Sequence, residues 1–252
     1  MTPAWLNPSI LEWELNISSW HSGNEDQVRR PYQHWHHANL LVESATSEFE
    51  RTDVVTTLKR AVDSRLRHLN DVYRFKAIPL ADKPDGIVET LGYFGIIRPM
   101  LISELLEVRN RVEHQDMEPP SQPRCRELVE FVWYFVRSTD LLVRQVADDF
   151  ELGGGPDDAY GLTVTIRKDG GWVLELWGWL PPDLLSDVER PSWFRLDLQR
   201  SETAQHIKAQ QRLAHGETYH ETRSDEDVLV EGRILGPGVL IRTLLTRYFE
   251  GA

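Results

Sequence analysis

Three polar side chains near the end of a long helical pattern have the chemistry that a phosphodiester requires. Arg109, Asn110 and His114 fall within six residues. The guanidinium of Arg109 is a permanent cation whose planar fork fits a phosphate, and the imidazole of His114 exchanges protons near neutral pH. The amide of Asn110 can orient either a ligand or the histidine. This segment is the first candidate for a catalytic site.

The helical spacing of these residues constrains how they can act together. At about 100° per residue, Asn110 and His114 share a helix face, whereas Arg109 and His114 lie about 140° apart. Arg109 and His114 can address one ligand only if the helix ends or loosens between them, or if two copies of the motif meet. The proline-rich loop that starts at Glu118 predicts a helix end near His114.

The composition bounds the classes of protein to which the chain can belong. The 252 residues favour two domains over one, and the 40% hydrophobic content is that of a globular protein. A net charge of −12 argues against broad nucleic-acid binding, although a few arginines can still focus potential in a local site. Neither a leader nor a long apolar run is visible, so we expect a cytoplasmic protein without a membrane contact.

No cofactor or metal ion is predicted. Cys125 is the single cysteine, which excludes a disulfide or a cysteine-based zinc site within one chain. His34 and His37 have a spacing that can share a metal, but no acidic residue lies at a matching distance. The glycine run 153–155 lacks the lysine and hydroxyl residue of a phosphate loop.

The predicted fold class is α+β, with an all-helical domain over residues 1–152 and a smaller α+β domain over 160–252. Residues 153–159, which begin with three glycines, are predicted to link them. The apolar spacing predicts four helical regions, of which the third is broken. They cover Asn24 to about Phe49, Val54 to about Phe75 with Asp53 as N-cap, Asp85 or Gly86 to His114 with a new helix from about Pro99, and Arg124 to about Phe150.

The second predicted domain contains an antiparallel sheet. Residues 162–168 and 172–179 form strands joined by the hairpin sequence Asp169-Gly170-Gly171, and 193–198 and 228–234 are further strands. Residues 203–214 and 239–249 are predicted helices. Trp172, Trp177 and Trp179 are expected in the core, although a stacking platform for a base is an alternative use of them.

The helical domain resembles the HEPN superfamily (higher eukaryotes and prokaryotes nucleotide-binding). The resemblance covers residues 24–152 and rests on Arg109-Asn110-x-x-x-His114, similar to that family's Arg-x4-6-His motif, and on the four-helix organisation. It implies a metal-independent endoribonuclease in which a 2′-hydroxyl attacks the adjacent phosphorus and leaves a 2′,3′-cyclic phosphate. His114 would be the general acid or base, Arg109 would bind the phosphate, and Asn110 would position one of them.

The resemblance also implies a homodimer, an RNA substrate, and a toxin–antitoxin or antiviral setting with an antitoxin or regulatory partner. An alternative is a catalytically inactive module that dimerises and binds a nucleotide or a protein partner. Candidate phosphate contacts outside the motif are Arg65, Arg67, His68 and Arg137. They can equally form a solvated face, and Arg137 can pair with Asp140 along its helix.

Overall fold

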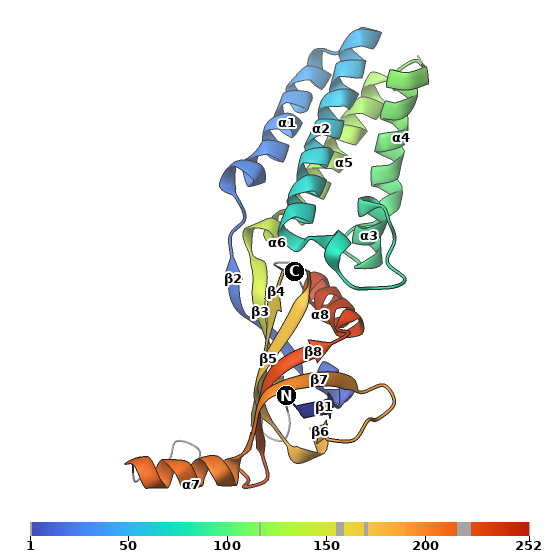
Figure 1. Cartoon of the computed structure of the whole chain (residues 1–252). Coiled ribbons are helices and arrows are strands. Elements are labelled where there is room, and N and C mark those ends of the chain that lie inside the picture. The colour runs from blue at the N-terminus through green and yellow to red at the C-terminus, as the bar shows by residue number, and fades with distance from the viewer. Residues whose placement is uncertain (1, 116, 155–158, 169–170, 216–222, 252) are drawn as a thin grey trace. The chain divides into compact units, whose positions relative to one another are not determined.

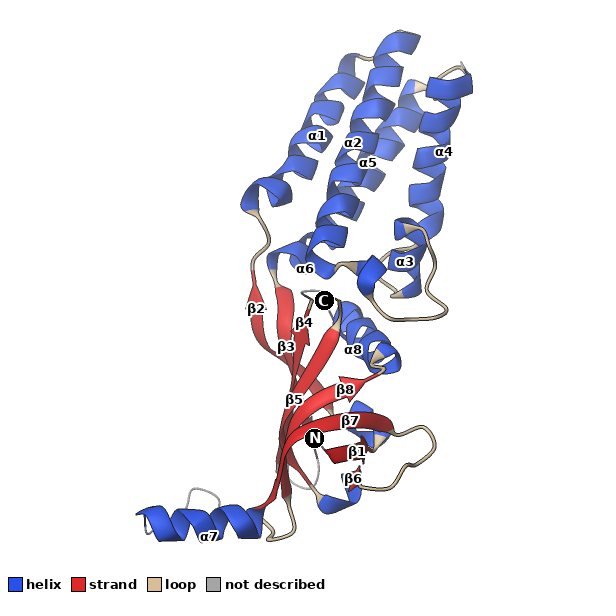
Figure 2. Ribbon diagram, viewed as in Figure 1, coloured by secondary structure: helices blue, strands red, loops and turns tan. Residues whose placement is uncertain are grey.

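The computed structural model contains both helices and an eight-stranded antiparallel sheet, which confirms the α+β class (Figures 1 and 2). It describes residues 2–115, 117–154, 159–168, 171–215 and 223–251, except for the side chains of 2, 101, 113–115 and 210–215. The chain forms two compact units. The helical unit comprises His21–Lys76, Ala81–Val146 and Tyr248–Ala252, and the sheet unit comprises Met1–Trp20, Ala77–Leu80 and Ala147–Arg247.

Four long helices lie side by side in the helical unit (Figure 2). They are α1 (Glu25–Ser44), α2 (Glu48–Tyr73), α4 (Pro99–Gln115) and α5 (Gln122–Ser138), accompanied by the shorter η2 (Phe75–Ala77), α3 (Ile87–Tyr93) and α6 (Asp140–Arg144). Helix α2 packs against α1, α4 and α5. Its predicted apolar stripe is buried, as the helical spacing requires: Val55, Leu58, Val62, Leu66, Leu69 and Tyr73.

The junction between α1 and α2 lies earlier than the sequence suggested. Helix α1 ends at Ser44, and Ser47 rather than Asp53 caps α2. The Glu50 carboxylate completes a capping box by accepting hydrogen bonds from the amides of Ser47 and Thr46, both at 2.8 Å. These bonds hold the pKa of Glu50 at about 2. Asp53 therefore lies inside α2, because the capping box upstream satisfies the first amides.

The sheet unit includes strands from both ends of the chain. Its order is β2-β3-β4-β5-β8-β7-β1-β6. The strands are β1 (Thr2–Leu6), β2 (Glu14–His21), β3 (Val146–Gly154), β4 (Tyr160–Arg167), β5 (Val173–Leu180), β6 (Leu185–Ser186), β7 (Phe194–Thr203) and β8 (Val228–Leu235). Short helices η1 (Pro8–Glu12) and η4 (Pro182–Leu184) and the longer α7 (Ala204–His215) and α8 (Gly238–Gly251) complete the chain.

Burial alternates along the central strands of the sheet. In β4 and β5 the even-numbered residues after Tyr160 are buried, including Leu162, Val164, Leu174 and Leu176, whereas their odd-numbered neighbours are partly or largely exposed, apart from Trp179. This period of two gives the sheet one apolar face and one open face.

Three boundaries differ from the sequence prediction. Residues 2–6 and 14–21 form strands, so residues 1–152 are not all helical. The helix predicted to run to Phe150 ends at Ser138, where the Thr139 hydroxyl donates to the Phe135 carbonyl at 2.8 Å, and β3 begins at Val146. Gly153 and Gly154 belong to β3 and pair with Gly161 and Tyr160, so they form a hairpin arm rather than a linker.

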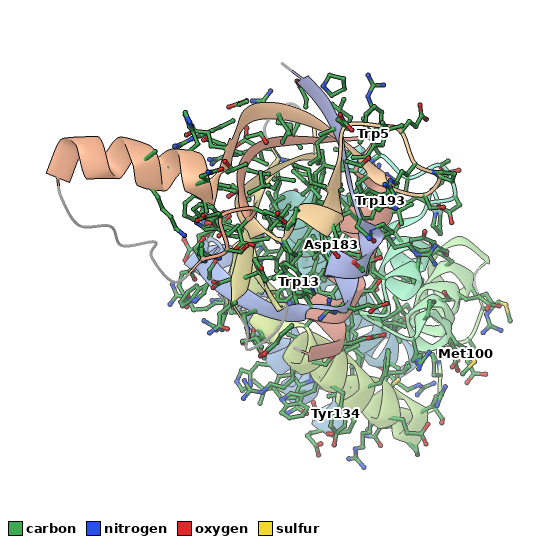
Figure 3. The ribbon with its side chains drawn as sticks, turned by 90° about the horizontal axis from the view of Figure 1, so that it is seen from below. Trp5, Trp13, Met100, Tyr134, Asp183 and Trp193 are labelled. Carbon is green, nitrogen blue, oxygen red and sulfur yellow. The ribbon has the colours of Figure 1, made fainter. Side chains whose placement is uncertain are left out.

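Close backbone approach explains two glycines. A Cβ on Gly154 would lie 2.4 Å from the ring of Trp13, which is labelled in Figure 3 and stacks on Tyr160. The amide of Gly23 donates to the Val143 carbonyl at 3.0 Å, and a Cβ on Gly23 would lie 2.5 Å from that oxygen. Within the described residues, we find no helix with the length and apolarity of a membrane span.

Candidate functional site

Helix α4 carries all three residues of the predicted motif without interruption. The helix starts at Pro99, buries Ile102 and Leu105, and continues to Gln115. It ends one residue after His114, as predicted, but it does not loosen between Arg109 and His114. The angular separation of about 140° between these two positions therefore remains within one chain.

A side-chain hydrogen bond draws the arginine toward the face that holds the other two residues. The Arg109 guanidinium donates from Nη1 to Asn110 Oδ1 at 3.1 Å. Because Asn110 and His114 occupy positions i and i+4, they share a helix face. The guanidinium of Arg109 consequently lies toward the Asn110 side of α4, although the Cα–Cβ bond of Arg109 is directed to a different side of the helix. The side chain of His114 lies outside the described part of the structure.

Carboxylates around the motif are largely engaged by arginines. Glu104 pairs with Arg124, Glu107 lies 3.8 Å from Arg111 Nε, and Glu118 lies 3.6 Å from Arg51 Nη2. Each of these contacts offsets a negative charge that would otherwise repel a phosphate. The side chains of Glu113 and Asp116 lie outside the described residues.

Arg65 and His68 belong to the interior of the helical unit. The Arg65 side chain is 0% exposed and donates from Nη2 to Asp140 Oδ1 at 2.9 Å. His68 is also buried, and burial followed by the positive charge of Arg65 lowers its pKa. The sequence interpretation of these two residues as substrate contacts is corrected, because no dissolved substrate reaches them.

Arg65 also lies far from the motif along α2. Arg51 connects the start of α2 to Glu118, just beyond the end of α4, whereas Arg65 connects the second half of α2 to α6. The two arginines are separated by about 21 Å along the helix axis at 1.5 Å per residue. Of the four predicted phosphate contacts, Arg67 and Arg137 are exposed.

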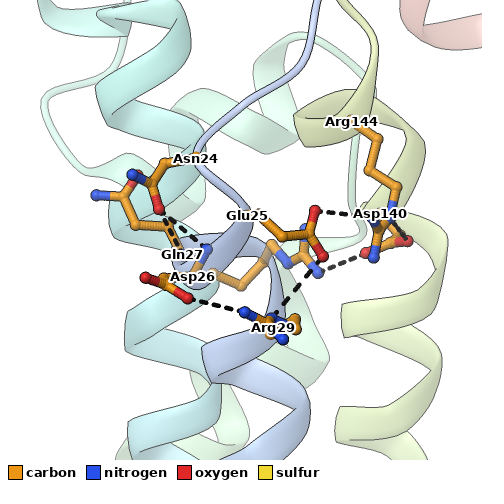
Figure 4. Close-up of polar contacts among 8 residues, drawn as sticks. Asn24, Glu25, Asp26, Gln27, Arg29, Asp140 and Arg144 are labelled. Carbon is orange, nitrogen blue, oxygen red and sulfur yellow. Dashed lines mark hydrogen bonds and ion pairs between the residues drawn. The ribbon is translucent and has the colours of Figure 1, made fainter.

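Asp140 forms a buried polar cluster that the sequence interpretation missed. It pairs with Arg65 and, through Oδ2, with Arg144 Nε at 2.7 Å, whereas the sequence suggested Arg137. Arg144 also lies 3.5 Å from Glu25, so the cluster joins α6 to α1 (Figure 4). Burial raises the pKa of Asp140, but the hydrogen bonds from Arg144 and Arg65 outweigh it and leave the pKa lowered.

The histidine pair on α1 does not assemble with other ligands. Among the described residues, we find no group of three histidine, cysteine or acidic side chains that could hold a metal ion. Burial, followed by the charges of Arg30 and Arg60, lowers the pKa of His34. Trp35 donates its indole N–H to the Val129 carbonyl at 2.9 Å, which anchors this part of α1 to α5.

Comparison with known proteins found no matching family model, no matching curated protein and no matching solved structure.

Proposed function

We propose that the helical unit is a metal-independent endoribonuclease of the HEPN type, with its site on α4. The 2′-hydroxyl of the substrate attacks the adjacent phosphorus, the bond to the 5′-oxygen breaks, and a 2′,3′-cyclic phosphate remains. His114 accepts the hydroxyl proton or donates one to the leaving oxygen. Arg109 holds the phosphate and stabilises the charge that develops on it.

The hydrogen bond between Arg109 and Asn110 is the observation that supports this proposal most directly. It directs the guanidinium toward the helix face of Asn110 and His114, which the spacing of the residues alone would not achieve. Asn110 is then the positioning residue. The end of α4 at Gln115 places His114 in the last turn of the helix.

The proposal includes a homodimer in which two motifs line one cleft. A second copy brings a second Arg109 to the site. The arginine of one copy can then act with the histidine of the other, so the separation of about 140° between Arg109 and His114 on one helix no longer prevents joint action. Exposed apolar side chains on the helices concerned are consistent with a covered face: Met100 at the start of α4 and Tyr134 on α5 (Figure 3). The setting we propose is toxin–antitoxin or antiviral defence, in which a partner restrains the nuclease.

The test is cleavage of a labelled RNA in the presence of EDTA by the wild type, Arg109→Ala and His114→Ala. Of these three proteins, we expect only the wild type to cleave, with 2′,3′-cyclic phosphate ends. Arg29→Ala is the matched control and should cleave as the wild type does, because Arg29 is an exposed arginine of the helical unit that pairs with Asp26 on α1, away from the motif. Equal cleavage by all four proteins, or loss of wild-type activity in EDTA, would refute the proposal.

A wild type that binds nucleotides through Arg109 but cleaves no RNA would instead favour a non-enzymatic binding module. Sedimentation analysis of the same proteins tests the dimer separately. Arg109→Ala should remain a dimer, because it removes a charge from the site and leaves Met100 and Tyr134 of the proposed dimer face in place.

A further inference from the structure

The open face of the sheet carries a row of aligned side chains from four neighbouring strands. Glu151 of β3 is the direct cross-strand partner of Thr163 in β4, which is the partner of Trp177 in β5, which is the partner of Glu231 in β8. Direct partners point to the same side of a sheet. At about 4.8 Å per strand, Trp177 therefore lies about 5 Å from the strand of Glu231 and about 10 Å from that of Glu151.

Trp177 is the exposed member of the tryptophans in this part of the sheet. Its exposed fraction is 52%, whereas Trp172 and Trp179 are buried. It borders two adjoining surface hollows, one toward Glu151 and Trp179 and the other toward Glu175 and Glu231. An indole ring in such a position offers a flat apolar surface with a negative face.

The charges on either side of the ring favour a cation. Glu151 and Glu231 form no salt bridge with any described residue, although the charge of Arg200 acts on Glu231 from a distance, and the nearby cations are paired with other carboxylates. Arg167 and Arg233 share Glu175, at 3.2 and 3.0 Å, and Arg200, opposite Glu231, donates to Glu202 at 2.6 Å. Phosphates of a nucleic acid would meet the carboxylates that remain, so this face disfavours RNA.

The same groove already accommodates a guanidinium from the chain itself. The Cζ of Arg223 lies 4.8 Å from the ring centroid of Trp179 and 5.9 Å from that of Tyr160. Its Nη1 donates to the Ala159 carbonyl at 3.1 Å, and Asp227 accepts from the Tyr160 hydroxyl at 2.9 Å. On this surface, aromatic rings with oxygen acceptors beside them therefore already bind one arginine side chain.

We propose that the open face of the sheet around Trp177 binds a basic peptide segment of a protein partner. An arginine or lysine side chain of that segment lies over the indole of Trp177, between Glu151 and Glu231. The second hollow, beside Glu175, receives the neighbouring part of the segment. This role belongs to the sheet unit and is independent of the α4 site, so either can fail without the other.

The probe is a short labelled peptide that alternates arginine and serine, titrated with the full chain by fluorescence anisotropy. We expect binding that weakens with added salt, and a loss of about tenfold or more in Trp177→Ala and in Glu151→Gln/Glu231→Gln. Trp177→Phe, which keeps an aromatic ring, should retain most of the affinity.

Two control variants match these changes in the same unit. Trp20→Ala removes another half-exposed tryptophan (53%) from β2, and Asp187→Asn/Glu189→Gln removes two exposed charges from the loop before β7. Both should bind the peptide as the wild type does. Absence of wild-type binding, equal binding by all variants, or Trp177-dependent binding of an oligouridylate in place of the peptide would overturn the proposal.

Discussion

Replacing Asp140 by alanine should destabilise the helical unit far more than replacing an exposed aspartate with an almost identical ion pair. Asp140 accepts from Arg65 at 2.9 Å with its side chain 10% exposed, and Asp26 accepts from Arg29 at 3.0 Å with its side chain 90% exposed. Figure 4 shows Asp26, Arg29, Asp140 and Arg144 in one view. The two substitutions therefore compare two ion pairs of nearly equal length, one with a buried carboxylate and one with an exposed carboxylate.

The expected magnitude follows from what each substitution leaves behind. Asp140→Ala leaves the guanidinium of Arg65 in the interior without a carboxylate, which costs about 3–5 kcal/mol of unfolding free energy. Asp26→Ala leaves Arg29 in water, so the loss should be at most about 1 kcal/mol, including the first-turn dipole effect. A domain is usually stable by about 5–15 kcal/mol, so the first change removes a large share.

Urea unfolding followed by far-UV circular dichroism measures both losses, because this signal reports the helices. Adding Arg65→Met to Asp140→Ala should recover part of the loss, since it removes the unpaired charge. A double-mutant cycle should give a coupling of about 2 kcal/mol or more. A loss for Asp140→Ala within about 1 kcal/mol of that for Asp26→Ala, or additive single changes, would refute the reasoning.

Two further predictions concern stability. Because burial lowers the pKa of His68, the unfolded chain takes up a proton first as the pH falls below about 6.5, so the helical unit should lose stability from there downward. His68→Asn should flatten this slope in urea titrations at several pH values, and an unchanged slope would contradict the assignment. Gly178 has a φ of 154°, and a Cβ there would lie 2.1 Å from the Gly161 carbonyl, so Gly178→Ala should lower the melting temperature of the sheet unit. Gly161→Ala, whose Cβ would meet only Glu151 at 3.6 Å, is the control and should melt near the wild type.

The parts of the fold that depend on neighbouring residues could be predicted from the sequence. The hairpin of β4 and β5 follows from alternation and a turn sequence, and the break before Pro99 follows from glycine and proline. The start of α2 was also encoded locally, since Ser47 and Glu50 have the spacing of a capping box. Asp53 is also a residue type that caps helices, and residue type alone does not decide whether Ser47 or Asp53 caps α2.

The parts of the fold that depend on residues far apart in the sequence could not be predicted from it. Ser18 of β2 donates to the Asp149 carbonyl across 131 positions of sequence, and no local period encodes such a pairing. The first residues of β3, Val146 to Phe150, were assigned to the end of a helix, because the spacing of their apolar residues suits a helix as well as a strand. Arg65 has the spacing of a solvated face, yet its partner lies 75 positions later. The motif on α4 was found because its residues are adjacent, whereas the bond from Arg109 to Asn110 needed coordinates.

The hydrogen bond between Gly23 and Val143 has a consequence for the order of folding. Strands β2 and β3 are neighbours in the sheet, but more than a hundred residues separate them. Closing a loop of that length costs about 3 kcal/mol more entropy than closing a short hairpin. Once the helices have folded, Gly23 and Val143 hold the two ends of the segment 3.0 Å apart. We therefore expect the helices to fold first and to act as a preformed turn that sets the register of β2 against β3.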